Sequence, residues 1–257
     1  LLADTSVTCW GLSSSGQAGR VALVAGAGEA VPGVGGSGAL SMAIDLGAGG
    51  AHSCALLFLG PVGTPGSLAC WGLNRSGALG DGGPLVDLAG PSPVEVVSPS
   101  SQAPLDGAWG IASGANHSCA LVNNISINNG VVCWGWNDGA QLGAGQQFQS
   151  SSRPLVVKDL TGDGVLYGAV QITAGYQHSC ALMNTSIDAV YCWGTSLFGA
   201  LGRGSGSSTT SRLPAPVVGE DGSGILRGVK SIASGPDETC AILGDRMVDC
   251  WGNGAEG

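Results

Sequence analysis

Nine cysteines are the residues of this chain best suited to covalent chemistry. Five stand before a Trp-Gly pair, and the other four follow His-Ser or, once, Glu-Thr. Cysteines can form disulfides or bind zinc as thiolates, but structural zinc sites use closely spaced cysteine pairs, which this chain lacks. Disulfides are therefore the favoured interpretation, and they indicate an oxidising compartment: extracellular, at the cell surface or in the secretory pathway.

Two pairing schemes are consistent with the order of the cysteines. The first joins the two cysteines of each repeat across a short hairpin and leaves Cys9 over: Cys54–Cys70, Cys119–Cys133, Cys180–Cys192 and Cys240–Cys250. The second joins each cysteine before Trp-Gly to the next repeat and leaves Cys250 over. We favour the first because all its separations are even, which keeps the two sulfurs on one rung of the hairpin. The partner of Cys9 would then precede Leu1, so we expect a fragment of a longer protein.

The Cys-Trp-Gly triplet recurs about every 60 residues and is followed each time by a turn-rich tail. Its tryptophans are Trp10, Trp71, Trp134, Trp193 and Trp251. Self-similarity with a period of this length is typical of solenoids, propellers and repeat arrays. The repeat is therefore the main guide to the fold.

Short strands explain the pattern inside each repeat. Val170, Ile172 and Ala174 alternate with polar residues, as in a half-buried strand, and the runs around the paired cysteines are bounded by turn-forming residues, as in a hairpin. Each repeat thus supplies three or four strands, which cannot bury both faces alone. Radial stacking of such units gives a β-propeller. We predict an all-β fold in which residues 1–257 form one β-propeller domain or a fragment of one.

Composition argues against two classes of partner. Glycine accounts for 47 of 257 residues, which indicates many tight turns. The net charge of −9 gives no electrostatic footprint for nucleic acid, and no basic cluster favours an anionic membrane. Apolar runs are too short and too rich in glycine to span a bilayer. We expect no nucleic-acid partner and no membrane insertion of this segment.

The combined frame "GxxHSCAL…VYCWGxNxxGxLG" resembles the repeat of the regulator of chromosome condensation family. The version with both cysteines is similar to the secreted bacterial and algal branches and to the ectodomains of Crinkly-type plant receptor kinases. The resemblance implies a propeller of four-stranded blades, most often seven, of which this chain holds four to five. The nuclear member of the family is a guanine-nucleotide exchange factor, an activity that the disulfides and acidic balance of this chain do not favour.

Four Asn-x-Ser/Thr sequons agree with a secretory pathway and are candidate glycosylation sites. Asn124 and Asn184 lie at predicted hairpin tips, which suit a bulky glycan best. Asn74 follows a Cys-Trp-Gly triplet, and Asn116 lies beside the repeated histidine, where burial would oppose modification.

The histidines His52, His117 and His178 occupy one slot of the repeat, and Glu238 occupies it in the fourth copy. Histidine can bind a metal or act as a general base. Equivalent residues of a propeller lie in different blades, however, and are usually well separated. The favoured interpretation is a structural histidine whose ring ties down an adjacent loop.

The tryptophans of the repeated triplet are predicted to pack between blades rather than to stack on a ligand. Trp109 and Trp136 lie outside that slot and are better candidates for exposed contacts, although core packing is favoured for them too. The glycines nine residues after the tryptophans are predicted to form turns with positive φ: Gly19, Gly80, Gly143 and Gly202.

Two segments rich in Asp and Gly could hold Ca²⁺, since carboxylate and carbonyl oxygens suit that ion. They contain Asp159 and Asp163, and Glu220 and Asp221. Such segments are commonly turns, which we favour here. The sequence also lacks a Gly-x-Ser-x-Gly elbow and a phosphate loop, so we predict no catalytic residue, metal or cofactor.

The leading hypothesis is a non-enzymatic extracellular interaction or structural scaffold built from disulfide-stapled blades. Its partner would be another protein or another copy of the chain. Two alternatives stay open: a lyase or hydrolase with a site at the central channel, by analogy of fold alone, and an activity like that of a guanine-nucleotide exchange factor.

Overall fold

The computed structural model describes residues 5–20, 28–58, 66–85, 89–124, 127, 129–147, 149–184, 186–204, 209–219 and 222–253. Within them lie three short 3₁₀ helices: η1 (Val34–Gly36), η2 (Arg75–Gly77) and η3 (Leu197–Gly199). The strands are β1 (Thr8–Cys9), β2 (Glu29–Ala30), β3 (Ala43–Ala48), β4 (His52–Leu57), β5 (Ser67–Leu73), β6 (Ala89–Glu95), β7 (Ala108–Ser113), β8 (His117–Val122), β9 (Gly130–Gly135), β10 (Ser151–Val156), β11 (Ala169–Ala174), β12 (His178–Met183), β13 (Val190–Gly194), β14 (Ser211–Pro216), β15 (Val229–Ser234), β16 (Glu238–Leu243) and β17 (Val248–Gly252). The predicted all-β fold is confirmed.

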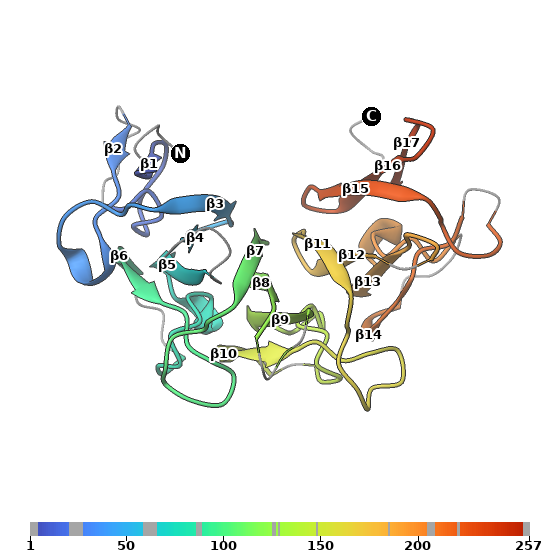
Figure 1. Ribbon diagram of the computed structural model, residues 1–257, viewed down its shortest axis with the longest axis horizontal. Helices are drawn as coiled ribbons and strands as arrows, with labels where there is room; N and C mark the ends of the chain where they lie inside the picture. Colours follow the sequence, from blue (N-terminus) through green and yellow to red (C-terminus); the bar gives the residue numbers. More distant parts are fainter. Residues whose placement is uncertain are drawn as a thin grey trace.

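Antiparallel sheets stand side by side in an arc around a common centre (Figure 1). Three of them have four strands, in the orders β3-β4-β5-β6, β7-β8-β9-β10 and β11-β12-β13-β14. The described residues add a three-stranded sheet, β15-β16-β17, and a two-stranded sheet, β1-β2. The strands β3, β7, β11 and β15 line the concave centre (Figure 1). Each sheet is thus a blade of a β-propeller.

A β-bulge interrupts the first strand of each of the four larger blades. The register with the second strand shifts at the same point in all of them: Ala43/Asp45, Ala108/Gly110, Ala169/Gln171 and Val229/Ser231. The extra residue resets the alternation of faces. Ala169 and Ile172 are therefore buried, whereas Val170 is 40% exposed. The simple alternation predicted for this strand was wrong at Val170.

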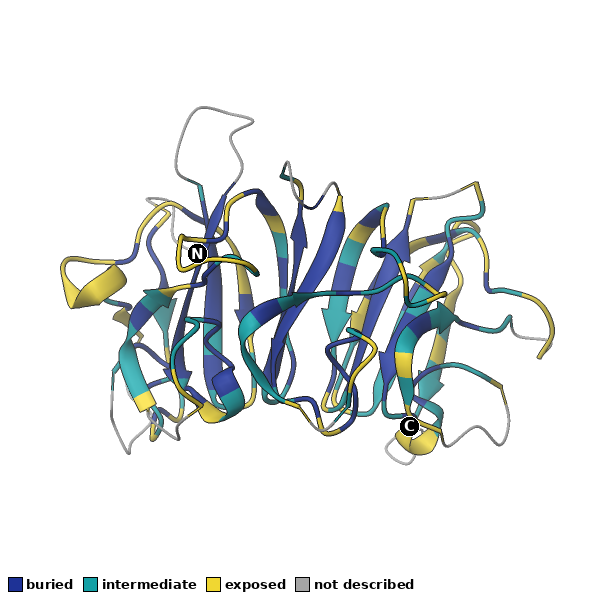
Figure 2. Ribbon diagram, turned by 90° about the horizontal axis from the view of Figure 1, so that it is seen from below, coloured by how far each residue is buried: buried dark blue, intermediate teal, exposed yellow. Residues whose placement is uncertain are grey.

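The apolar core lies between neighbouring blades. One cluster joins Leu56 of β4 to Ile111 of β7 and Trp134 of β9, and equivalent clusters follow at the next two junctions. Figure 2 shows the buried residues running along the strands and many of the exposed ones gathering in the loops at the two ends. Every residue of β8 and β9 is buried. Each blade therefore depends on its neighbours to cover its faces.

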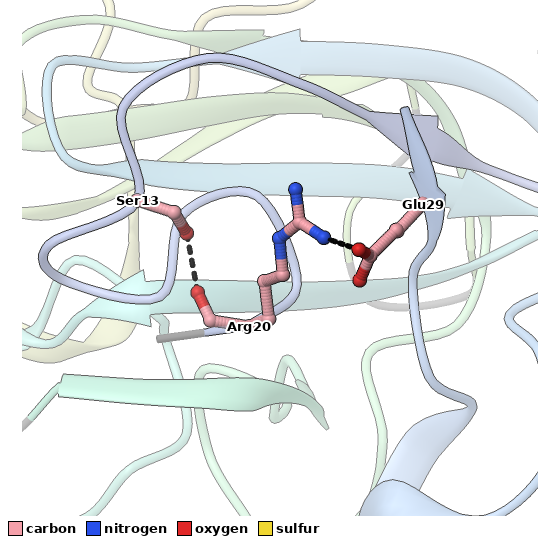
Figure 3. A network of polar contacts seen from close by, with 3 residues as sticks. All are labelled: Ser13, Arg20 and Glu29. Atoms are coloured by element: carbon pink, nitrogen blue, oxygen red, sulfur yellow. Dashed lines mark hydrogen bonds and ion pairs between the residues drawn. The ribbon is translucent and has the colours of Figure 1, made fainter. Parts of the chain in front are cut away.

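A polar network closes the loop after β1 onto β2 (Figure 3). The Ser13 hydroxyl donates to the carbonyl oxygen of Arg20 and accepts the N–H of Ala18, and the Arg20 guanidinium pairs with the Glu29 carboxylate. The ion pair is partly exposed, so its contribution to stability is modest. No helix among the described residues is long and apolar enough to cross a membrane.

Candidate functional site

Each of the four larger blades carries one disulfide across its central hairpin. The pairs are Cys54–Cys70, Cys119–Cys133, Cys180–Cys192 and Cys240–Cys250. Each cysteine lies directly opposite its partner in the strand register, with Cα atoms 4.0–4.1 Å apart. These are the bonds of the first pairing scheme. The first three disulfides are fully buried, whereas Cys250 is exposed.

Cys9, which this scheme leaves over, is a free and partly buried thiol. It lies opposite Glu29 in the two-stranded sheet. Burial raises the pKa of this thiol above its ordinary value, so it is protonated at neutral pH and is a poor nucleophile.

The repeated histidines join neighbouring blades through a side-chain hydroxyl. The Nε2 atoms lie 2.8–2.9 Å from the hydroxyl oxygen of the next blade, in the pairs His52–Ser118, His117–Ser179 and His178–Thr239. Burial lowers the pKa values of His52, His117 and His178 to about 4, about 3 and about 4, and so keeps all three neutral at pH 7. The favoured structural role fits this geometry, but the group that each ring ties down belongs to the next blade.

The same hydroxyl lies against the disulfide of the preceding blade. Ser118 Oγ is 3.7 Å from Cys54 Sγ, and Ser179 Oγ is 3.6 Å from Cys119 Sγ. We call the histidine, the hydroxyl and the disulfide together the His joint. A Ser-His pair also activates nucleophiles in hydrolases, but both side chains of these pairs are buried, which withholds them from substrate.

Glu238 occupies the histidine slot of the last described blade. Its Oε2 accepts the N–H of Asp237 at 3.1 Å. Within the part of the chain that the structure describes, Glu238 makes no link of the His-joint type.

The tryptophans form a second set of links between blades. Each indole Nε1 donates to a carbonyl in the loop of the preceding blade, in the pairs Trp71–Gln17, Trp134–Ala78, Trp193–Gln141 and Trp251–Ala200. Packing between blades is confirmed for these four. It is wrong for Trp10, which is 74% exposed, because within the described residues no loop of a preceding blade lies over it as such loops lie over Trp71 and Trp134.

The glycines that follow the tryptophans have the positive φ that was predicted. The φ values of Gly19, Gly80, Gly143 and Gly202 are 79°, 69°, 62° and 62°. A Cβ atom on Gly80 or Gly143 would lie 2.8 or 2.7 Å from the indole nitrogen of the next blade's tryptophan. Both the backbone and the neighbouring indole therefore require glycine at these two positions.

Trp109 and Trp136, the two tryptophans outside the repeated slot, differ in exposure. Trp109 is the bulge residue of β7 and is 40% exposed, whereas Trp136 is partly buried.

The four predicted glycosylation sites differ in their surroundings. Asn74 is buried, and its Nδ2 donates to Asp81 at 3.2 Å. Asn116 is partly buried beside a His joint. Asn124 is partly buried, with its Nδ2 bonded to Asp106, and Asn184 is exposed. Asn184 is therefore the most accessible of the four.

The segment around Asp159 is a turn. Asp159 Oδ1 accepts hydrogen bonds from the hydroxyl and the N–H of Thr161 and from the N–H of Gly162. The hydroxyl bond is the main reason that the pKa of Asp159 is lowered. Asp163 is exposed, and Glu220 and Asp221 lie outside the described residues. No cluster of three or more His, Cys, Asp or Glu side chains suited to a metal occurs among the residues described.

A cavity of about 330 Å³ opens at the concave centre. It is lined by the turns that follow the first strands of the four larger blades, which we call the Gly rim: Gly49–Gly50, Gly114–Ala115, Gly175–Tyr176 and Gly235–Pro236. This cavity was not predicted from the sequence. The available signal was the glycine that opens each copy of the repeated frame, because four equivalent turns of a propeller meet at one end of its centre.

Four-stranded sheets set around a centre and linked by histidine and tryptophan side chains define a β-propeller of repeated blades. A model of the regulator of chromosome condensation (RCC1) repeat matches residues 65–121 and 128–182, and a second model of the same repeat matches residues 169–200. The chain belongs to the RCC1-repeat family, and the resemblance seen in the sequence is confirmed.

Two relatives align with different fractions of the chain. It is 32% identical over 216 residues to E3 ubiquitin-protein ligase HERC2 of Mus musculus, which is 83% of this chain and 4% of that protein. It is 32% identical over 148 residues to Ultraviolet-B receptor UVR8 of Arabidopsis thaliana, which is 57% of this chain and 30% of that receptor. The chain thus spans less than a third of the length of either relative.

Among solved structures, Prp20p of Saccharomyces cerevisiae matches with a TM-score of 0.70 and 23% identity, over 98% of this chain and 55% of that one. That structure was described together with the binding of Prp20p to Gsp1p and histones. At this level of identity the match establishes the fold of our chain.

Proposed function

We propose that the chain is a non-enzymatic protein-interaction or scaffold module of an extracellular or secretory compartment. The observation that carries the proposal is that the chemically reactive side chains of the repeat are engaged in structural contacts. Eight cysteines form disulfides, the three histidines are buried in links between blades, and four of the repeated tryptophans donate to neighbouring loops. The loops and the concave centre remain for contact with partners, and the loops differ in sequence from blade to blade.

The proposed compartment is inferred from the disulfides. Closing a hairpin of this length stabilises a fold by about 3 kcal/mol in the chain-entropy model. Four such bonds are a large part of the stability of an ordinary domain, so a reducing environment would weaken this one severely.

Mapping disulfides in protein from its natural source, with thiols blocked at harvest, tests this compartment. We expect the four hairpin bonds to be present. Glycopeptide analysis of the same sample should find glycan on Asn184 and not on Asn74, because only the side-chain amide of Asn184 is open to solvent. Free thiols at Cys119 and Cys133 would contradict the proposal.

Binding to secreted and cell-surface proteins tests the interaction role. A partner identified by cross-linking should bind the purified chain saturably, and substitutions in the loops should weaken that binding while the fold is retained. Two assays address the alternatives: a broad screen for hydrolysis or elimination, and release of nucleotide from small GTPases. Turnover or nucleotide release that requires the folded chain would overturn the non-enzymatic assignment.

A further inference from the structure

The Gly rim has no backbone donors left for a ligand. The first N–H of each turn bonds to a carbonyl three residues later, as from Gly49 to His52 and from Gly235 to Glu238. The second N–H bonds to the next blade, as from Gly50 to Ala115 and from Tyr176 to Pro236. The remaining turns repeat these bonds, and Pro236 has no N–H. The rim therefore cannot surround an anion with N–H groups.

Carbonyl oxygens crowd the same rim. The oxygen of Gly114 lies 2.6 Å from the place of a Cβ atom on Gly49, and the oxygen of Gly235 lies 2.7 Å from that place on Gly175. Only glycine lets the oxygens approach so closely. The rim oxygens of Ala115, Gly175 and Pro236 each accept one backbone N–H, and a carbonyl oxygen with one such bond keeps a second lone pair.

The chemistry around the carbonyls also favours a cation. Tyr176 is 46% exposed and is the aromatic residue that lines the cavity. None of the lining residues is charged, but Asp237 and Glu238 follow Pro236 directly, and the whole chain carries a net charge of −9. Aromatic faces and carbonyl oxygens both attract cations, and an acidic protein raises their local concentration.

We propose that the Gly rim binds the guanidinium group of an arginine side chain presented by a protein partner. The guanidinium is planar, so it can stack on Tyr176, and its five donors can reach several rim carbonyls at once. A cavity of about 330 Å³ is large enough for one long side chain. This inference rests on the proposed interaction role, since it names the group by which a partner is held.

Titration of the ¹⁵N-labelled chain with capped arginine, N-acetylarginine amide, tests the site without a partner. We expect backbone amide shifts at the four rim turns. N-acetylcitrulline amide has nearly the same shape without the charge, and it should bind roughly fivefold more weakly. Preference for free L-arginine over the capped form would overturn a protein side chain as the source.

Two tyrosines that flank β11, one before it and one after it, give matched variants. Tyr176→Ala should weaken binding of capped arginine roughly threefold, because it removes the aromatic face. Tyr167→Ala should leave the affinity unchanged, since Tyr167 is 54% exposed but does not line the cavity. The amide spectrum shows whether each variant is folded.

The results of these titrations test the arginine site independently of the proposed function. An absence of rim shifts, or equal binding of the citrulline analogue, overturns the arginine site even if protein partners are found. Rim shifts that require the charge and Tyr176 support the site even if the search for a natural partner fails.

Discussion

Burial makes the three repeated histidines sensitive to acid. Their pKa values are about 4, about 3 and about 4 in the folded chain, below the ordinary value of 6.5. The unfolded chain therefore binds protons first as the pH falls. Their contribution to stability is complete above pH 6.5 and is lost progressively as the pH falls toward the folded values.

His117→Gln should reduce this acid sensitivity. Glutamine keeps a polar group near Ser179 but does not titrate, so the variant should lose about 2 kcal/mol less unfolding free energy than the parent chain between pH 7 and pH 5. Urea unfolding at the two pH values measures this difference, and the variant's lower stability at pH 7 cancels in it. Equal pH slopes for the two proteins would mean that His117 is not held neutral.

Substitutions at two glycines with positive φ distinguish the cost of backbone strain from the cost of a packing clash. Gly143→Ala would place Cβ 2.7 Å from the indole nitrogen of Trp193, whereas the nearest atom to a Cβ on Gly145 is 3.8 Å away. We expect Gly145→Ala to cost about 1 kcal/mol, from the backbone alone, and Gly143→Ala about 3 kcal/mol or more. Thermal unfolding of both variants checks this, and similar losses would show that the indole contact does not require glycine.

Among the elements, the hairpins differ in how well they protect their disulfides. The bond of β16 and β17 contains the exposed Cys250, whereas Cys119 and Cys133, which join β8 and β9, are fully buried. A reducing thiolate must reach a sulfur atom before exchange can occur.

Under mild reduction, Cys240–Cys250 should therefore open first and Cys119–Cys133 among the last. Alkylation at timed intervals followed by peptide mass analysis gives the order. Simultaneous loss of all four bonds would instead indicate that reduction follows global unfolding.

Sequence spacing was sufficient for the hairpins, since even separations and the repeated Cys-Trp-Gly triplet locate both strands and their register. The bulge at Val170 was not predictable, because one extra residue changes the alternation without any change of composition. The partner of each histidine was also missed. It is the serine or threonine before the first cysteine in the next copy, and contacts between copies leave no trace in the spacing within one copy. Trp10 matches its repeat in sequence but not in burial, because burial depends on a neighbour.

At the scale of the whole molecule, the links run only between adjacent blades. Indole donors reach back to the preceding blade, and histidines reach forward to the next. The blade of β8 and β9 has a histidine link on both sides, whereas that of β16 and β17 has a histidine link on one side only within the described chain. Stability in such an array is a sum of blade terms and nearest-neighbour terms.

The tryptophan and histidine links at each junction thus make the opening of a blade depend on how many linked neighbours it has. When an indole loses its hydrogen bond to the loop of the preceding blade, that one junction opens and the other junctions stay intact. Amide exchange with deuterium in residues 1–257 should consequently be slowest in β8, β9 and β12, whose blades have histidine links on both sides, and faster in β1 and β17, whose blades have fewer links within the described chain.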